Sequence, residues 1–137
     1  MIVADTGAVL ALLDADEEHH ETLRALFEAD PGAWCLPWAV LPEVDYLLAT
    51  RLGDKVERAF ADDLAGGAFH VEWGETADLL RAAELNARYK SLRLGLVDGV
   101  VMAVAERLGA AAIATLDVKH FAAVKLEGRP RLLPRDL

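Results

Sequence analysis

Short apolar runs alternate along the chain with longer segments whose apolar residues recur at helical spacing. Short apolar or alternating runs bounded by turn-forming residues are typical of strands. They predict strands over residues 1–5, 34–38, 69–73, 111–115 and 130–134. An apolar repeat of three to four residues predicts helices instead. Those helices are expected over residues 17–29, 42–52, 54–64, 75–89 and 97–108, with a shorter one over 8–13.

Local residues indicate where several of these helices begin. Pro42 suits the first turn of a helix, because its missing N–H has no partner to lose there. Asp54 follows Gly53 and is expected to cap the next helix. For the helix over 75–89, the spacing predicts an inward face made of Ala77, Leu80, Ala83 and Ala87 or their neighbours.

Alternating strands and helices predict an α/β sandwich with a mainly parallel sheet. In such sheets, functional sites form beyond the carboxyl ends of the strands. Asp5 closes the first predicted strand, Asp117 follows the strand that ends at Thr115, and Asp98 opens the helix before that strand. We therefore expect these three carboxylates to meet at one edge of the sheet.

Composition limits the class of protein. The chain has 137 residues, of which 54% are hydrophobic, as expected for one packed domain. No apolar run reaches the roughly 20 residues that cross a bilayer, so no membrane association is expected, and a cytoplasmic location follows by default. The single cysteine, Cys35, is expected to be a small buried residue.

The net charge of −9 at first disfavours a nucleic-acid partner, because phosphate backbones are held by lysine and arginine. The charge is uneven, however. Residues 1–30 carry eight acids against Arg24 alone, whereas residues 118–137 carry five cations against two acids. Arg88, Lys90 and Arg93 form a second basic cluster. Local positive surface is therefore available for a phosphate backbone, and the acidic segment for a basic protein.

Each candidate acid also has an ordinary structural explanation. Asp5 can form a turn after its strand, and Glu43 can complement a helix dipole in the first turn. Asp98 can cap its helix or, as a half-buried acid, hold a cation. Asp117 can cap a short helix that runs through residue 121. We favour Glu43 over Asp45, because two residues turn a helix by roughly 200°.

Four acids in one place would repel each other and raise their own pKa values unless a cation lay among them. Mg²⁺ suits such a site, because it takes oxygen ligands and keeps positions for water and phosphate. A cation would also let an acidic pocket accept a polyanion and would activate water for hydrolysis. The acids Asp5, Glu43, Asp98 and Asp117 are thus predicted to form a metal-dependent site that hydrolyses phosphodiesters.

Four stretches resemble the motifs of PIN-domain ribonucleases, specifically the VapC-like toxins of type II toxin–antitoxin pairs. These stretches are residues 2–6 (IVADT), 42–48 (PEVDYLL), 96–105 (LVDGVVMAVA) and 113–121 (IATLDVKHF). They occur in the family's order and span nearly the whole chain.

The resemblance implies a single PIN-like domain over residues 1–137 with a three-layer α/β/α sandwich fold. It implies a Mg²⁺- or Mn²⁺-dependent endoribonuclease that forms homodimers and is inhibited by a VapB-like antitoxin. Asp5 and Asp98 would be the firmest metal ligands, with Glu43 and Asp117 completing the site. Substrate contacts would come from Thr6, Thr115 and Lys119.

Two positions depart from the family pattern. Gly7 stands where many relatives have serine or asparagine, and Val118 stands where a basic residue is common. Two other interpretations stay open. One is a catalytically weak module that binds metal and RNA without turnover. The other is an interaction protein whose main role is to bind an antitoxin. The histidines show no zinc-like spacing, so surface or packing roles are expected for them.

Overall fold

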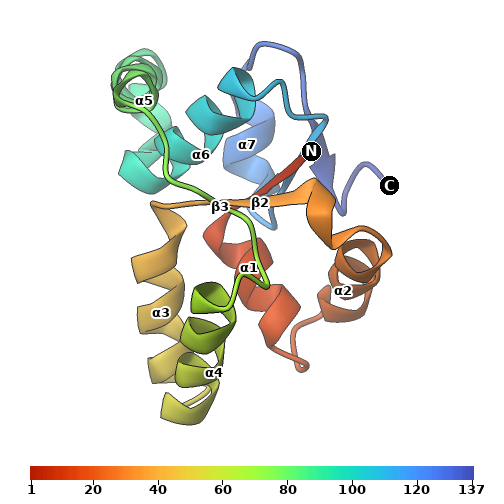
Figure 1. The fold of residues 1–137 in the computed structure, drawn as a ribbon. Helices are drawn as coiled ribbons and strands as arrows, with labels where there is room; N and C mark the ends of the chain where they lie inside the picture. The colour runs from red at the N-terminus through yellow and green to blue at the C-terminus, as the bar shows by residue number, and fades with distance from the viewer.

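A computed structural model describes all residues from 1 to 137 and contains five parallel strands in one sheet (Figure 1). The sheet order is β3-β2-β1-β4-β5. The strands are β1 (Ile2–Ala4), β2 (Trp34–Pro37), β3 (Val71–Glu72), β4 (Ala112–Ala114) and β5 (Arg131–Leu133). Every predicted strand is present, although β3 keeps only two of the five residues predicted for it.

Helices cover both faces of the sheet, which confirms the three-layer α/β/α sandwich. In Figure 1 one layer lies below the sheet and the other above it. The first layer is α1 (Thr6–Leu13), α2 (His20–Ala29), α3 (Val40–Arg51) and α4 (Asp54–Ala65). The second is α5 (Thr76–Arg88), α6 (Gly95–Arg107) and α7 (Val118–Ala123). Two short 3-10 helices, η1 (Pro31–Ala33) and η2 (Lys90–Leu92), complete the chain.

The strands are short and apolar because helices bury both faces of the sheet. Every residue of β2 and β4 is buried. Cys35 in β2 is fully buried, and this burial raises the pKa of its thiol to about 11. The prediction of a small buried cysteine is confirmed. No helix has the length and apolar character needed to cross a bilayer.

The starts of several helices, or the residues that cap them, differ from the prediction. Helix α2 begins at His20 rather than residue 17, because the preceding residues form turns in which the N–H of Glu17 donates to the carbonyl of Asp14. Asp54 is the first residue of α4 and makes no side-chain cap, since Gly53 occupies the cap position with φ of +94°. Pro42 lies in the first turn of α3, as predicted.

The inward face of α5 is made by neighbours of the four residues named in the prediction, which are themselves exposed. Leu80 is 64% exposed, and the buried residues of the helix are Asp78, Ala82 and Leu85. An ion pair explains the rotation. Arg107 of α6 donates to both carboxylate oxygens of Asp78, at 2.7 and 3.0 Å. A hydrophobic pattern cannot indicate a helix face that is anchored by a buried carboxylate.

The outer edge of β5 is covered by the end of the chain. The residues of a strand alternate their backbone groups between its two neighbours, so Leu132 points its N–H and C=O away from β4. Its N–H donates to Oδ2 of Asp136 at 2.7 Å, and its carbonyl accepts from the N–H of Asp136 at 2.7 Å. The C-terminal turn therefore takes the place of a sixth strand at this residue.

Candidate active site

Two neighbouring parallel strands bring the first site residues together. Ala4 of β1 lies opposite Ala114 of β4, so the residues that follow them, Asp5 and Thr115, leave the sheet side by side. Both are buried, with Thr115 at 0% exposure and Asp5 at 5%. The carboxyl edge of the sheet is thus polar at its centre, as the strand-end rule predicts.

Asp5 is held by two hydrogen bonds. Its Oδ1 accepts from the backbone N–H of Ala8 at 2.8 Å, which caps α1, and its Oδ2 accepts from the hydroxyl of Thr115. Burial nevertheless raises the pKa of Asp5 to about 6, with smaller contributions from the charges of Asp98 and Asp117. The cap role and the place in the cluster therefore coexist in one side chain.

Asp98 is the fourth residue of α6, and Leu94 occupies the cap position of that helix. The alternative that Asp98 caps the helix is therefore wrong. Burial, followed by the charge of Asp117, raises the pKa of Asp98 to about 6, while His120 acts in the opposite direction. The loss of hydration, together with the repulsion from Asp117, therefore outweighs the stabilisation that a first helical turn gives to a carboxylate.

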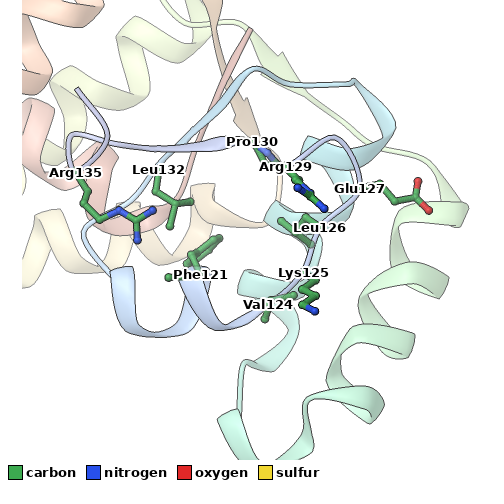
Figure 2. Close-up of a pocket in the computed structure, with 10 residues that line it drawn as sticks. Phe121, Val124, Lys125, Leu126, Glu127, Arg129, Pro130, Leu132 and Arg135 are labelled. Carbon is green, nitrogen blue, oxygen red and sulfur yellow. The ribbon is translucent and has the colours of Figure 1, made fainter.

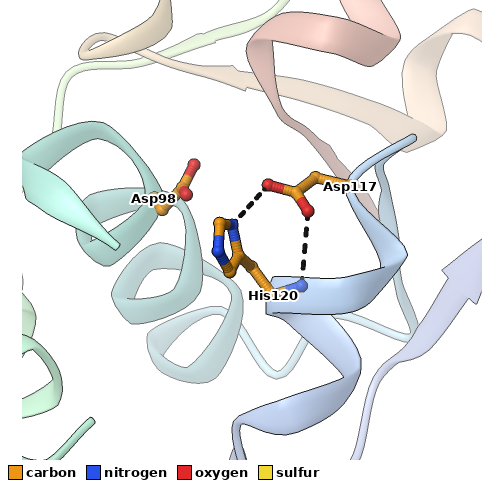
Figure 3. Close-up of side chains that lie close together, drawn as sticks. All are labelled: Asp98, Asp117 and His120. Carbon is orange, nitrogen blue, oxygen red and sulfur yellow. Dashed lines mark hydrogen bonds and ion pairs between the residues drawn. The ribbon is translucent and has the colours of Figure 1, made fainter. Parts of the chain in front are cut away.

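Asp117 caps α7, as predicted, and also faces Asp98 (Figure 3). Its Oδ1 accepts from the backbone N–H of His120 at 3.3 Å, and its Oδ2 lies 2.7 Å from Nδ1 of the same residue. One ligand atom from each of Asp98, Asp117 and His120 lies within 4.8 Å of the other two. This cluster of two carboxylates and one imidazole is compact enough to hold one cation.

Thr115 joins the two acids that follow the strands. Its hydroxyl donates to Asp5 and accepts from the backbone N–H of Asp117 at 3.0 Å. This bridge fixes the carboxylate of Asp5 and the backbone of Asp117 relative to β4. Because Thr115 is fully buried, its hydroxyl reaches these two acids and not the solvent.

Glu43 lies at the rim of the cluster. It is an exposed residue in the first turn of α3, and its charge raises the pKa of Asp98. It lies outside the compact group of Asp98, Asp117 and His120. Asp45 faces α4, where its hydrogen bond raises the pKa of Glu57. The two acids of α3 thus point in different directions, as the helical spacing predicts.

The remaining predicted contacts flank the acids. Thr6 is 7% exposed, and its hydroxyl is a buried group without a hydrogen-bond partner, directly after Asp5. Lys119 is exposed on α7, two residues after Asp117. An unpaired hydroxyl beside a buried acid is a costly arrangement in a protein core. It is the kind of group that a metal-bound water or a phosphate oxygen would satisfy.

The donor set fits a hard divalent cation. Asp5, Asp98 and Asp117 interact electrostatically through their charges, and the pKa values of Asp5 and Asp98 are raised to about 6. A cation among them would stabilise their charged forms and offer the oxygen ligands that such ions prefer. The structure therefore brings together three of the four predicted acids and places Glu43 at their edge.

His120 was not predicted as part of this cluster. Its signal in the sequence is its spacing, because residues three apart on a helix lie on one face and Asp117 stands at the start of α7. Spacing alone gives no reason to choose His120, since three-residue separations are common. The choice becomes clear only once α6 places Asp98 against the start of α7.

Comparison with known proteins gives consistent matches over nearly the whole chain. Residues 2–126 match the PIN domain family. Ribonuclease VapC26 of Mycobacterium tuberculosis is 34% identical over 130 residues, which cover 95% of this chain and 96% of that protein. The crystal structure of VapC20 of the same species, a toxin that cleaves the sarcin-ricin loop, has a TM-score of 0.80 at 27% identity, covering 95% of this chain and all of that one. A DNA-bound VapBC structure from Salmonella typhimurium shares the fold, with a TM-score of 0.73 at 18% identity over 96% of this chain and 95% of that one.

Proposed function

Because this chain belongs to the PIN-domain family, we propose that it is a metal-dependent endoribonuclease acting as the toxin of a toxin–antitoxin pair. The observation that carries the proposal is the convergence of Asp5, Asp98 and Asp117 at the carboxyl edge of the sheet. Ribonuclease VapC26 matches the chain from end to end at 34% identity. PIN nucleases generally use divalent ions, and we assign Mg²⁺, or Mn²⁺ in its place, to this site.

The residues would divide the work as follows. Asp5 and Asp98 would hold the cation, and Asp117 and Glu43 would complete the site from the ends of α7 and α3. A bound divalent cation supplies positive charge that favours the deprotonation of water and stabilises charge on phosphate oxygens. Thr115 orients the carboxylate of Asp5 and holds the backbone of Asp117 through its two hydrogen bonds.

His120 is a positioning residue in this scheme, because it acts through Asp117. Its Nδ1 lies 2.7 Å from Oδ2 of Asp117 and limits the rotation of that carboxylate. Lys119 extends from the same helix into solvent, where its ammonium group would contact a phosphate of the substrate. A phosphate oxygen of the same substrate would give the buried hydroxyl of Thr6 a hydrogen-bond partner.

The test compares RNA cleavage by the purified protein in Mg²⁺ and in EDTA. Asp5→Asn and Asp98→Asn should abolish cleavage and weaken Mn²⁺ binding measured by calorimetry, whereas Asp62→Asn should change neither, since Asp62 is exposed on α4. Undiminished cleavage by both site variants would refute the assignment of these acids. Cleavage that persists in EDTA would refute the requirement for a metal.

We further propose that residues 1–137 act as one PIN domain that forms a homodimer and binds a VapB-like antitoxin. Structural neighbours from Salmonella typhimurium, Rickettsia felis and Neisseria gonorrhoeae share the fold. The first two are described as VapBC bound to DNA, and the third as FitAcB. An RNA substrate would place the action of the protein in the cytoplasm. Co-purification with the product of a neighbouring gene should yield a complex without nuclease activity, and light scattering of the free protein should give twice the mass of 14.8 kDa.

A further inference from the structure

We propose that a groove between α7 and β5 binds the single-stranded RNA chain next to the cleavage site, with phosphates on Lys125 and Arg129. This inference rests on the proposed ribonuclease function and adds a substrate subsite to it. The groove has a volume of about 570 Å³ and lies beside the last strand of the sheet (Figure 2).

The groove combines an apolar floor with a cationic rim. Phe121 approaches from α7, Val124 from the end of that helix, and Leu132 from β5, while Lys125, Arg129 and Arg135 stand along its sides (Figure 2). Glu127 is the one acid that lines it. Sugars and base edges can lie on apolar side chains while phosphates contact cations, which is how single strands are commonly held.

Lys125 and Arg129 are available for a ligand. Most arginines of the second helical layer are already neutralised: Arg81 pairs with Glu84 and Glu106, and Arg107 with Asp78 and Glu72. Neither Lys125 nor Arg129 has a carboxylate within 4.0 Å. Both cations therefore face the same hollow with no carboxylate to neutralise them.

The groove and the acidic site lie along the same helix. Helix α7 starts at the cap Asp117, carries His120 in its first turn and then contributes Phe121 to the groove. Six helical residues span about 9 Å, so one RNA chain can reach both places. At the other end, Arg135 also lines a second hollow of about 420 Å³ whose wall includes Thr115.

The basic cluster of residues 88–93 adjoins the groove. The N–H of Lys125 donates to the hydroxyl of Tyr89 at 3.1 Å, and the guanidinium of Arg88 lies 5.8 Å from the centre of the same ring. Tyr89 therefore brings Arg88 close to the backbone of Lys125, and the two basic segments that are separate in the sequence contact each other there.

Arg129 is held in an unfavourable backbone conformation. It follows Gly128 in a tight turn with φ of +45°, and only one other non-glycine residue, Arg93, has positive φ. A left-handed backbone conformation is unfavourable for a bulky residue. Both strained positions carry an arginine of the two basic segments, where glycine or asparagine would fit with less strain.

The experiment measures binding of a fluorescent single-stranded RNA 12-mer in EDTA, where the metal-dependent cleavage is absent. The variant is Lys125→Gln with Arg129→Asn, because asparagine tolerates positive φ. Arg51→Gln with Lys55→Gln is the matched control, since these cations lie at the junction of α3 and α4, away from α7. Each phosphate contact on a single strand contributes about −0.7 to the slope of log K against log salt.

Because the groove variant lacks two phosphate contacts, we expect its slope of log K against log salt to be less negative by about 1.4. At 0.1 M salt it should bind the RNA about 25-fold more weakly than the wild type. The control should match the wild type in both. If the double variant is unfolded by circular dichroism, Lys125→Gln alone is used, and half of the loss in slope is expected.

The outcomes separate the subsite from the function. If the wild type cleaves RNA and the groove variant binds RNA with an unchanged slope, the subsite is wrong while the nuclease stands. If the wild type neither binds nor cleaves RNA, the proposed function fails and the subsite with it. If poly-glutamate binds more tightly than RNA of equal charge, the groove accommodates an acidic protein partner and the proposal is overturned.

Discussion

Replacing Asp5 by asparagine should stabilise the metal-free protein while removing its metal-dependent activity. Burial, together with the charges of Asp98 and Asp117, raises the pKa of Asp5 from 3.8 to about 6. An acid whose pKa is raised in the folded state destabilises that state whenever it is ionised. Asparagine keeps the shape of the side chain and, like the protonated acid, carries no charge.

The magnitude follows from the two pKa values. At pH 7.5 the shift from 3.8 to about 6 corresponds to a penalty of about 3 kcal/mol. Below the unfolded-state pKa of 3.8, Asp5 is protonated in both states and imposes no penalty. As the pH rises from there through about 6, the folded state binds more protons than the unfolded state, so the free energy of unfolding falls. At pH 5 the same linkage leaves about 1.6 kcal/mol of penalty. The gain from the substitution should therefore roughly halve between pH 7.5 and pH 5.

Urea unfolding in EDTA at the two pH values measures this gain. Asp62→Asn, which changes an exposed acid on α4, is the control and should leave the free energy of unfolding unchanged at both. Added Mn²⁺ should stabilise the wild type and not the Asp5→Asn protein, since binding to the folded state alone raises its stability. The reasoning would be refuted by a variant that is less stable than the wild type in EDTA at pH 7.5, or by a gain that does not change with pH.

Four further substitutions test the packing and the site. Gly7→Ala should raise the free energy of unfolding by about 0.5–1 kcal/mol, because the new Cβ meets its nearest atom at 3.6 Å. Gly99→Ala should lower it by about 1–3 kcal/mol, because its Cβ would meet α5 atoms at 2.8 and 2.9 Å. Urea unfolding measures both changes, and a change of the same sign in both variants would contradict this reasoning. Arg107→Met should cost about 3 kcal/mol or more, since it leaves the carboxylate of Asp78, 2% exposed, without its partner; a loss below 1 kcal/mol in the same assay would show that the pair matters little. Thr115→Val removes the hydrogen bond that lowers the pKa of Asp5, so the affinity for Mn²⁺ should fall more at pH 6 than at pH 8. Calorimetry measures this affinity, and an equal fall at both pH values would count against that role of Thr115.

The elements were predictable where one physical signal dominates. Short apolar runs locate β1, β2 and β4, because strands buried on both faces have no polar side to alternate with. The place of Asp5 follows from this, since the residue after a buried strand emerges at the carboxyl edge. Asp117 follows β4 by the same logic, and its role as the cap of α7 agrees with its residue type.

Predictions failed where a long-range contact decides the outcome. The inward face of α5 is set by the pairing of Asp78 with Arg107, 29 residues away. The start of α6 at Gly95 lies three residues before the acid, so Asp98 cannot be its cap. His120 joins the cluster only because α6 and the first turn of α7 meet. Neither hydrophobic spacing nor local propensity indicates which residues meet in the folded chain.

The turn that covers the outer edge of β5 limits how copies of the protein can associate. The outward-facing amide and carbonyl of Leu132 are the groups through which a foreign strand would have to join this side of the sheet, and Asp136 already occupies both. A new strand would first have to displace that turn, together with the bidentate contact between Arg135 and Asp136. Growth of the sheet across this boundary is therefore blocked, and a dimer formed on this side would have to be built from side chains rather than from shared backbone.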